Sequence, residues 1–341
     1  MPDYSKTFRA AAVQAEPVWN DADKGIDKLI AYAAHAKENG ADIVAFPEVW
    51  IPGYPWFLWL DSVAWQSQFV LPYATNSLEI GGERWQRIER AAAEIGISIA
   101  FGFSEREAGS LYMGQAVIDA SGTTLHTRRK LKPTHVERTH FGEGDGSDIA
   151  VVDTPLGRIG SLNCWEHLQP LTKYAMFAQD EQLHIAAWPS FSIFPGMVNA
   201  LSAEVNNGAS RQYAVEGQTF VLAPCALIGP AAQELFADTD QKKQLLALGG
   251  GYARIYGPDG SSLASPLAPD EEGILYADVD YAHILAAKNA ADPVGHYSRP
   301  DVFTLEFTRT GRLPKVSPVA GTADVGPEAE EVPDAALAGE R

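Results

Sequence analysis

Asn163-Cys164-Trp165-Glu166-His167 joins an apolar strand to the start of a helix, and it carries one of the two cysteines of the chain. Residues 156–162 (LGRIGSL) predict the strand. Residues 169–176 (QPLTKYAM) predict the helix, because Pro170 stands at an early helical position and apolar residues follow with helical spacing. Catalytic groups gather at such junctions in α/β sheets. Cys164 is therefore either a nucleophile presented at a strand end or a small buried hydrophobic residue, the usual fate of a free cysteine.

Strands and helices alternate along the rest of the chain. Apolar strands are predicted at 7–14, 42–46, 97–103, 183–188 and 220–223, and helices at 21–39, 82–95 and 202–216. Turns at 119–122 and 257–260 each separate two short strand patterns and predict hairpins. Fully apolar strands between helices indicate an α/β protein with a mixed sheet covered by helices on at least one face.

The composition limits the classes of protein to consider. A chain of 341 residues with 46% hydrophobic content can bury a large core. Its net charge of −18 argues against nucleic acid and anionic membrane as partners, because both require basic patches. Two cysteines are too few for a disulfide framework or a cysteine-based zinc site, and they fit a reducing compartment. No secretion signal is recognisable and no apolar run approaches the ~20 residues of a membrane span, so we expect a cytoplasmic protein.

The domain organisation is predicted to be simple. No internal repeat, linker or charge boundary appears before about residue 310, so we expect residues 1–310 to form a single domain. Residues 311–341 are an acidic, Pro- and Ala-rich extension without an apolar face to bury. We expect this extension to be disordered or to lie at an oligomer interface.

A nucleophilic Cys164 needs a base, because a free thiol with a pKa near ~8.5 is mostly protonated at neutral pH. None of the eight histidines stands out: His167 begins the next element, and His184 alternates inside an apolar strand as a core residue does. Glu48 stands out as the lone charge in a strongly apolar stretch that follows a strand. It either points to solvent from the strand end or is a general base.

Energetics set a condition on Glu48 as the base. With ordinary pKa values of ~4.3 and ~8.5, a glutamate would take a thiol proton at a cost of about 6 kcal/mol. Burial among Phe46, Trp50 and Tyr54 is expected to raise the pKa of Glu48 and so to narrow this gap.

A thiolate also needs a nearby cation, and residues 128–132 (RRKLK) supply a basic cluster at a strand end. Such a cluster is usually a solvated face. Lys130 and Lys132 share one face by alternation, so the pattern does not choose between them. The Gly-rich loop at 142–146 could let backbone approach a substrate, but it lacks the spacing of a phosphate-binding loop.

Glu48 in Phe-Pro-Glu, Lys130 in Arg-Arg-Lys-Leu-Lys-Pro-Thr and Cys164 in Asn-Cys-Trp-Glu together resemble the Glu-Lys-Cys triad of the nitrilase superfamily, in the same chain order. The tryptophan after the cysteine and the runs at 128–146 and 184–190 look like the nitrilase branch. The resemblance extends from about residue 7 to residue 303. It implies a four-layer αββα sandwich, selects Lys130 as the catalytic lysine and makes Glu137 a second, supporting glutamate.

The resemblance also implies a reaction. Cys164 would attack a nitrile carbon while Glu48 takes its proton, giving a thioimidate and later a thioester, and the products would be a carboxylic acid and ammonia. Lys130 and the backbone N–H of Trp165 would stabilise the tetrahedral intermediates. Neither a cofactor nor a metal is implied. An amidase, a carbamoylase or a cyanide-degrading relative would use the same triad, and a catalytically silent, filament-forming interaction protein is the alternative from another class.

Aromatic residues crowd the segment after Glu48, where four of the eight tryptophans lie: Trp50, Trp56, Trp59 and Trp65. They form either core and oligomer interface or an aromatic pocket wall together with Tyr54, Trp165 and Trp188. The runs at 188–192 and 203–207 resemble arylacetonitrile-hydrolysing bacterial nitrilases, which implies a bulky nitrile as the small-molecule substrate. The resemblance further implies a homo-oligomer, with dimers that build spiral filaments and a C-terminal extension that takes part.

Overall fold

The computed structural model describes residues 2–309, which contain two β-sheets. One sheet has seven strands in the order β10 (Cys225–Ala226), β1 (Thr7–Ala15), β2 (Ile43–Ala45), β3 (Ser98–Glu107), β4 (Ser110–Ile118) and β5 (Thr124–Arg129), with β12 (Gly273–Asp280) also paired to β1. The other has five, in the order β11 (Arg254–Tyr256), β9 (Phe220–Ala223), β8 (Leu183–Ala187), β7 (Gly157–Asn163) and β6 (Val151–Thr154). Both mix parallel and antiparallel pairs.

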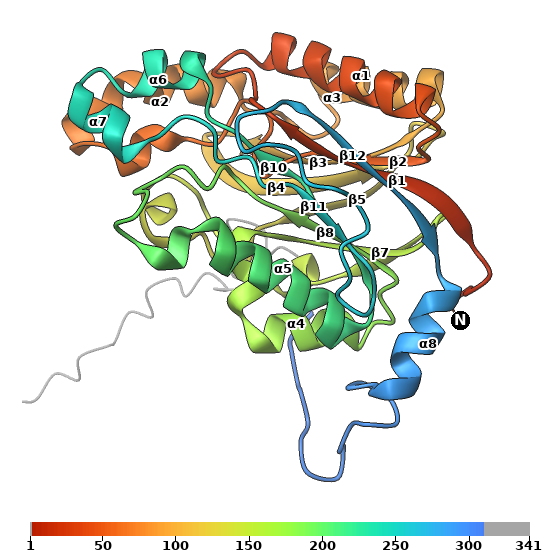
Figure 1. Cartoon of the computed structure of the whole chain (residues 1–341). Helices are drawn as coiled ribbons and strands as arrows, with labels where there is room; N and C mark the ends of the chain where they lie inside the picture. The colour runs from red at the N-terminus through yellow and green to blue at the C-terminus, as the bar shows by residue number, and fades with distance from the viewer. Residues whose placement is uncertain (1, 310–341) are drawn as a thin grey trace, which may run out of the picture.

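The two sheets lie face to face between two pairs of helices (Figure 1). The helices are α1 (Ala22–Glu38), α2 (Val63–Asn76), α3 (Glu83–Ile95), α4 (Pro170–Phe177), α5 (Ala203–Gly217), α6 (Pro230–Phe236), α7 (Asp240–Leu245) and α8 (Ala282–Ala290). α1 and α3 pack on the outer face of the seven-stranded sheet, and α4 and α5 on that of the five-stranded sheet. Buried residues of both inner faces, such as Ala12 and Leu162, form one apolar cluster. The expected four-layer αββα sandwich is confirmed.

Local signals explain where the main helices begin and end. Asp21 caps α1 by accepting a hydrogen bond from the Lys24 N–H, and Ser202 caps α5 in the same way from Val205. Gly96 ends α3 in the left-handed conformation, with φ of 72°. Pro170 is the first residue of α4, as predicted.

Some predicted elements differ from the structure. The second arm of the hairpin after Gly260 is no strand, because only Ser262 forms a bridge to β11. Helix α2 had no periodic signal, since Phe69 and Tyr73 are its only buried residues among those described. In residues 2–309 no helix has the length and apolar character that crossing a membrane requires. The predicted disorder of the extension at 311–341 lies outside the described residues.

The sandwich brings three strand ends together. Glu48 follows β2, Lys130 follows β5 directly, and Cys164 follows β7 directly. Strands β2 and β5 point the same way, because β3 runs parallel to β2 and antiparallel to β4, and β4 is antiparallel to β5. The Glu48 N–H donates to the Trp188 carbonyl at 3.3 Å, which joins the end of β2 to the end of β8 in the other sheet.

Candidate active site

Lys130 lies between two carboxylates in a site closed to solvent. Its Nζ is 2.9 Å from Glu48 Oε1 and 2.8 Å from Glu137 Oε2, and all three side chains are buried. Glu137 is held on both oxygens, because Oε1 accepts from the Tyr54 hydroxyl at 2.6 Å and Oε2 also accepts from the Thr134 N–H at 2.5 Å. Glu48 Oε2, in contrast, has no hydrogen-bond partner among residues 2–309. The cluster therefore leaves one carboxylate oxygen available for another proton.

Lys132, which the alternation pattern left as an equal candidate to Lys130, points elsewhere. Its side chain is exposed and pairs with Glu143. Strand β5 ends at Arg129, so strand alternation no longer applies to the next residues. The choice of Lys130 from the resemblance agrees with this geometry.

Cys164 begins a short 3₁₀ helix, Cys164–Leu168, at the end of β7. Its backbone adopts φ of 48°, in the left-handed region that non-glycine residues rarely occupy. Such conformations cost about 1–3 kcal/mol and gather at functional sites. The thiol lines a cavity, and the neighbouring Trp165 backbone N–H acts to lower the thiol pKa. The prediction that Cys164 is presented at a strand-to-helix junction is confirmed.

Burial governs the protonation of this site. Burial raises the pKa of Glu48 to about 8, although the Lys130 charge acts against it. Burial, and then the Glu48 charge, raise the pKa of Cys164 well above its ordinary value. Burial alone would lower the pKa of Lys130, but the carboxylates of Glu137 and Glu48 outweigh it and raise that pKa well above the ordinary value.

The expected rise in the Glu48 pKa is thus confirmed, but the thiol pKa rises as well, so the rise at Glu48 does not by itself narrow the gap between the two. The same low-dielectric surroundings raise the pKa of the thiol, because its charged form is disfavoured for the same reason. The resting Cys164 is a neutral thiol. A nucleophilic attack by this sulfur would therefore have to be accompanied by loss of the thiol proton.

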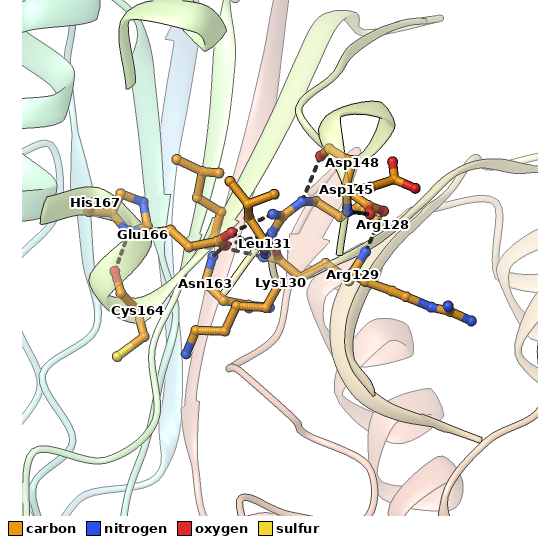
Figure 2. Close-up of polar contacts among 12 residues, drawn as sticks. Arg128, Arg129, Lys130, Leu131, Asp145, Asp148, Asn163, Cys164, Glu166 and His167 are labelled. Carbon is orange, nitrogen blue, oxygen red and sulfur yellow. Dashed lines mark hydrogen bonds and ion pairs between the residues drawn. The ribbon is translucent and has the colours of Figure 1, made fainter. Parts of the chain in front are cut away.

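A buried ion pair ties the Lys130 and Cys164 strand ends together (Figure 2). Arg128 Nη2 and Nη1 donate to the two Glu166 oxygens at 2.6 and 2.8 Å. The same carboxylate accepts from the Leu131 N–H at 2.8 Å and the Asn163 N–H at 2.7 Å. Glu166 therefore holds the residues beside Lys130 and Cys164 at a fixed separation. In Figure 2 the Cys164 sulfur and the Lys130 ammonium both point away from this pair.

The sequence interpretation missed the joint role of Arg128 and Glu166. Arg128 belonged to the basic cluster and Glu166 to the motif after Cys164, so both signals were present in the sequence, but their pairing was not. Gly102 on β3 was missed too. A Cβ there would lie 2.5 Å from the Val49 nitrogen and 2.9 Å from Glu48 Cα, so only glycine lets the Glu48 backbone rest on β3.

An aromatic cavity opens onto Cys164. The three predicted substrate-binding residues, Tyr54, Trp165 and Trp188, all line it. The tryptophans after Glu48 divide between the two interpretations: Trp56 and Trp59 also line the cavity, whereas Trp50 packs in the core under α1 and Trp65 bonds to Asp238 on the surface.

Two hydrogen bonds hold the cavity walls in place. The Trp165 indole N–H donates to Asn206 Oδ1 at 2.9 Å, and the Trp188 indole N–H donates to the Ser210 hydroxyl at 2.8 Å. Both acceptors lie on α5. Glu137 is the only carboxylate or cation that lines the cavity in the part of the chain that the structure describes. No group of three or more His, Cys, Asp or Glu within residues 2–309 is arranged to hold a metal ion.

Comparisons with known proteins agree with this fold. The family model for carbon-nitrogen hydrolases matches residues 9–289. An aliphatic nitrilase of Rhodococcus rhodochrous is 53% identical over 92% of this chain and 86% of its own. An arylacetone-specific nitrilase of Alcaligenes faecalis is 48% identical over 91% of this chain and 87% of its own. A carbon-nitrogen hydrolase from Helicobacter pylori has the same fold, with a TM-score of 0.71 at 17% identity over 88% of this chain and 98% of its own. The chain therefore belongs to the carbon-nitrogen hydrolase family.

Proposed function

We propose that this protein is a nitrilase, which hydrolyses an organic nitrile to the carboxylic acid and ammonia. Two relatives that share about half of their residues with this chain are named as nitrilases. The observation that carries the proposal is the buried Lys130, paired with Glu48 and Glu137 beside the Cys164 cavity while one Glu48 oxygen stays unpaired. We assign Cys164 as the nucleophile, Glu48 as the general base and Lys130 as the cation that stabilises developing charge.

The first half of the reaction forms a thioimidate. The Cys164 sulfur bonds to the nitrile carbon as the thiol proton moves to Glu48, and the nitrile nitrogen then takes that proton. Lys130 stabilises the charge that develops on nitrogen. A neutral resting thiol fits this order, because the base acts only when substrate is in place.

The second half releases both products. Water adds to the thioimidate carbon while Glu48 takes one of its protons and passes it to nitrogen. The remaining hydroxyl proton then moves to nitrogen too, and ammonia leaves a thioester. A second water hydrolyses the thioester, and the sulfur leaves as the Cys164 thiol. The Trp165 N–H and Lys130 are the donors to the tetrahedral intermediates, and the loss of one such donor lowers kcat by ~10²-fold or more. Glu137 orients Lys130.

For the substrate we propose a neutral, bulky nitrile of the arylacetonitrile type. The support is the cavity wall of Tyr54, Trp165 and Trp188, with no charged group but Glu137 from the described residues. Aromatic walls favour stacking with an aryl ring. The named relatives include both an aliphatic and an arylacetone-specific enzyme, so the argument depends on the cavity. Phenylacetonitrile should release ammonia faster than a short aliphatic nitrile, and equal or slower release would refute the aryl preference.

The reaction itself is tested with phenylacetonitrile and phenylacetamide, by ammonia assay and chromatography of the acid. We expect faster turnover of the nitrile. Cys164→Ala should lower kcat by ~10⁴-fold or more. Cys225→Ala is the matched control, since Cys225 is the other free cysteine but is buried and bonds to the Pro189 carbonyl. Faster release from the amide would make the protein an amidase, and no turnover of either substrate, of carbamoyl compounds or of cyanide would support the silent interaction protein.

We further propose that the protein works in the cytoplasm as a homo-oligomer whose dimers build spiral filaments. A reduced Cys164 suits a reducing compartment. Exposed apolar side chains on α4 and near the end of the described chain, among them Leu171 and Phe303, are candidates for subunit contacts. Residues 1–310 are proposed as the hydrolase domain and residues 311–341 as an extension at the oligomer interface. Light scattering and electron microscopy of the full chain and of a chain ending at residue 310 test this, and equal particle sizes would refute a role for the extension.

A further inference from the structure

Apart from the Lys130 cluster, a series of hydrogen bonds between buried side chains ends on the backbone of Cys164. The hydroxyl of Tyr213 on α5 lies 2.6 Å from Glu181 Oε2, and Glu181 Oε1 lies 2.7 Å from His184 Nδ1. His184 Nε2 lies 2.9 Å from His167 Nε2, and His167 Nδ1 lies 2.6 Å from the Cys164 carbonyl oxygen. All four side chains are buried. The series thus connects a helix on the outer face of the sandwich to the candidate nucleophile.

One neutral arrangement of protons satisfies every link, and burial favours it because it lowers the pKa of His184 well below the ordinary value. A carbonyl only accepts, so His167 Nδ1 carries a hydrogen. Burial and then His184 lower the pKa of His167 to about 3, so this ring is neutral and its Nε2 accepts. His184 Nε2 is then the donor to His167, and a neutral His184 must accept at Nδ1.

The proton donated to His184 must come from Glu181. Burial raises the pKa of Glu181 to about 8, so this carboxyl holds a proton at neutral pH, and its other oxygen accepts from the Tyr213 hydroxyl. Gly160 on β7 makes room for this group, because a Cβ there would lie 2.1 Å from Glu181 Oε1. The four linked side chains are therefore neutral, and each of them donates its hydrogen bond in the direction of Cys164.

His167 is separated from the substrate. It does not line the cavity, its Nε2 faces His184, and the Trp188 ring stacks on it with 5.3 Å between centroids. It is thus no general base for the reaction. Its contact with the active site is the hydrogen bond to the Cys164 carbonyl, drawn in Figure 2.

That carbonyl shares a peptide plane with the Trp165 N–H. In a trans peptide the C=O and the N–H point in opposite directions, so a carbonyl held toward the core aims the N–H the other way. The Trp165 N–H acts to lower the pKa of the Cys164 thiol, which places it on the side of the sulfur, and that sulfur belongs to a residue that lines the cavity. The left-handed φ of 48° at Cys164 makes this peptide costly to hold without such a contact.

We propose that His167 is a positioning residue which, supported by His184, Glu181 and Tyr213, locks the Cys164–Trp165 peptide so that the Trp165 N–H faces the reacting atoms. The inference rests on the proposed function, in which the Trp165 N–H donates to the tetrahedral intermediates. Glu181 in this scheme donates a hydrogen bond and carries no charge.

The test compares pairs of nearly isosteric variants in the full chain. His167→Asn keeps an N–H at the δ position, whereas His167→Leu has a similar shape and no donor. We expect kcat for phenylacetonitrile to fall ~10²-fold in His167→Leu, as for loss of an oxyanion donor, with KM within about threefold of wild type, and to recover at least tenfold in His167→Asn. Glu181→Gln keeps the donor and should stay within about threefold of wild type, whereas Glu181→Met should lose at least about tenfold.

Two readouts separate this role from a structural one. Circular dichroism and thiol titration give the folded fraction, to which kcat is normalised, and a merely structural role would lower that fraction without the split between kcat and KM. A folded His167→Leu with kcat within threefold of wild type, or a Glu181→Gln as impaired as Glu181→Met, would overturn the proposal. If His167→Leu does not fold, the Glu181 pair decides. If the wild type hydrolyses no nitrile, the proposed function fails. The kcat ratios of the His167 and Glu181 variants to wild type, measured on the substrate that the protein does hydrolyse, then decide the inference.

Discussion

Glu48 and Glu181 are two fully buried carboxyls whose pKa burial raises to about 8. Their hydrogen bonds differ. Glu181 uses both oxygens, on His184 and Tyr213, within the core of the five-stranded sheet. Glu48 uses one, on Lys130, and leaves the other unpaired within the described residues. A raised pKa therefore does not by itself identify a catalytic base. The unsatisfied oxygen of Glu48 distinguishes the two, because in the ionised carboxylate it alone is free to take a proton.

The largest difference between Glu48 and Glu181 is expected when each is replaced by glutamine. Glu48→Gln removes the group that takes the thiol proton, so we predict that kcat falls by ~10³-fold or more. Glu181→Gln preserves the donor to His184 and should stay within about threefold of wild type. Steady-state ammonia release measures both. Comparable losses in the two variants would mean that the unpaired oxygen does not mark the base.

The second-largest effect is expected at Lys130, which lies between the carboxylates of Glu48 and Glu137. Lys130→Met should lower kcat by ~10²-fold or more and the free energy of unfolding by about 3 kcal/mol, because Glu48 and Glu137 would be left buried without their cation. Lys132→Met is the matched control, since this exposed lysine pairs only with Glu143 among the described residues. Its free energy of unfolding should stay within about 0.5 kcal/mol of wild type in urea titrations. An active Lys130→Met would contradict the assigned role.

The pH dependence of kcat/KM sharpens the comparison further. The base must be a carboxylate, and the pKa of Glu48 lies at about 8, so kcat/KM should rise about tenfold per pH unit below that value and level off above it. Glu181→Gln should keep this limb unchanged, although it removes a carboxyl with the same pKa. If the rise of kcat/KM with pH disappeared in Glu181→Gln, the titrating group would be Glu181 and not Glu48, which would contradict our scheme.

Stability should show the smallest effect, and here the two carboxyls should behave alike. A carboxyl whose pKa is raised in the folded state stabilises the fold fully below its unfolded pKa of about 4.5 and loses this contribution as pH rises through about 8. Glutamine does not titrate. Both Glu→Gln variants should therefore raise Tm relative to wild type at pH 8, by at least about 2 °C, with the difference vanishing toward pH 4.5. Calorimetry at both pH values tests this, and the opposite trend would mean that the carboxyls are ionised in the fold.

What could be predicted from the sequence were features that depend on neighbours in the chain. Apolar runs that end in a polar residue located Glu48, Lys130 and Cys164, and turn and cap residues located most helices. Alternation could not separate Lys130 from Lys132, because it assumes that the strand continues, whereas β5 ends at Arg129. The resemblance made that choice.

Features that depend on packing between distant segments could not be predicted. Arg128 meets Glu166 only once the two sheets have paired, and Glu181 meets Tyr213 only once α5 packs on the five-stranded sheet. His184 was interpreted as a satisfied core residue, and both of its ring nitrogens are bonded, but its connection to Cys164 through His167 has no sequence signal. The pKa of a buried thiol was misjudged for the same reason, since burial acts on every group that a site encloses.

The two tryptophan walls of the cavity are both fastened to α5, through Asn206 and Ser210, which lie one turn apart. The reacting groups, in contrast, come from the ends of β2, β5 and β7. In the proposed scheme, the positions of the two indole rings thus depend on α5, whereas the three triad residues depend on the strand ends. During divergence, or in a directed-evolution campaign, replacements at Asn206 and Ser210 should change the range of accepted nitriles more than the rate of the bond-breaking steps, whereas replacement of Tyr213 on the same helix should lower that rate.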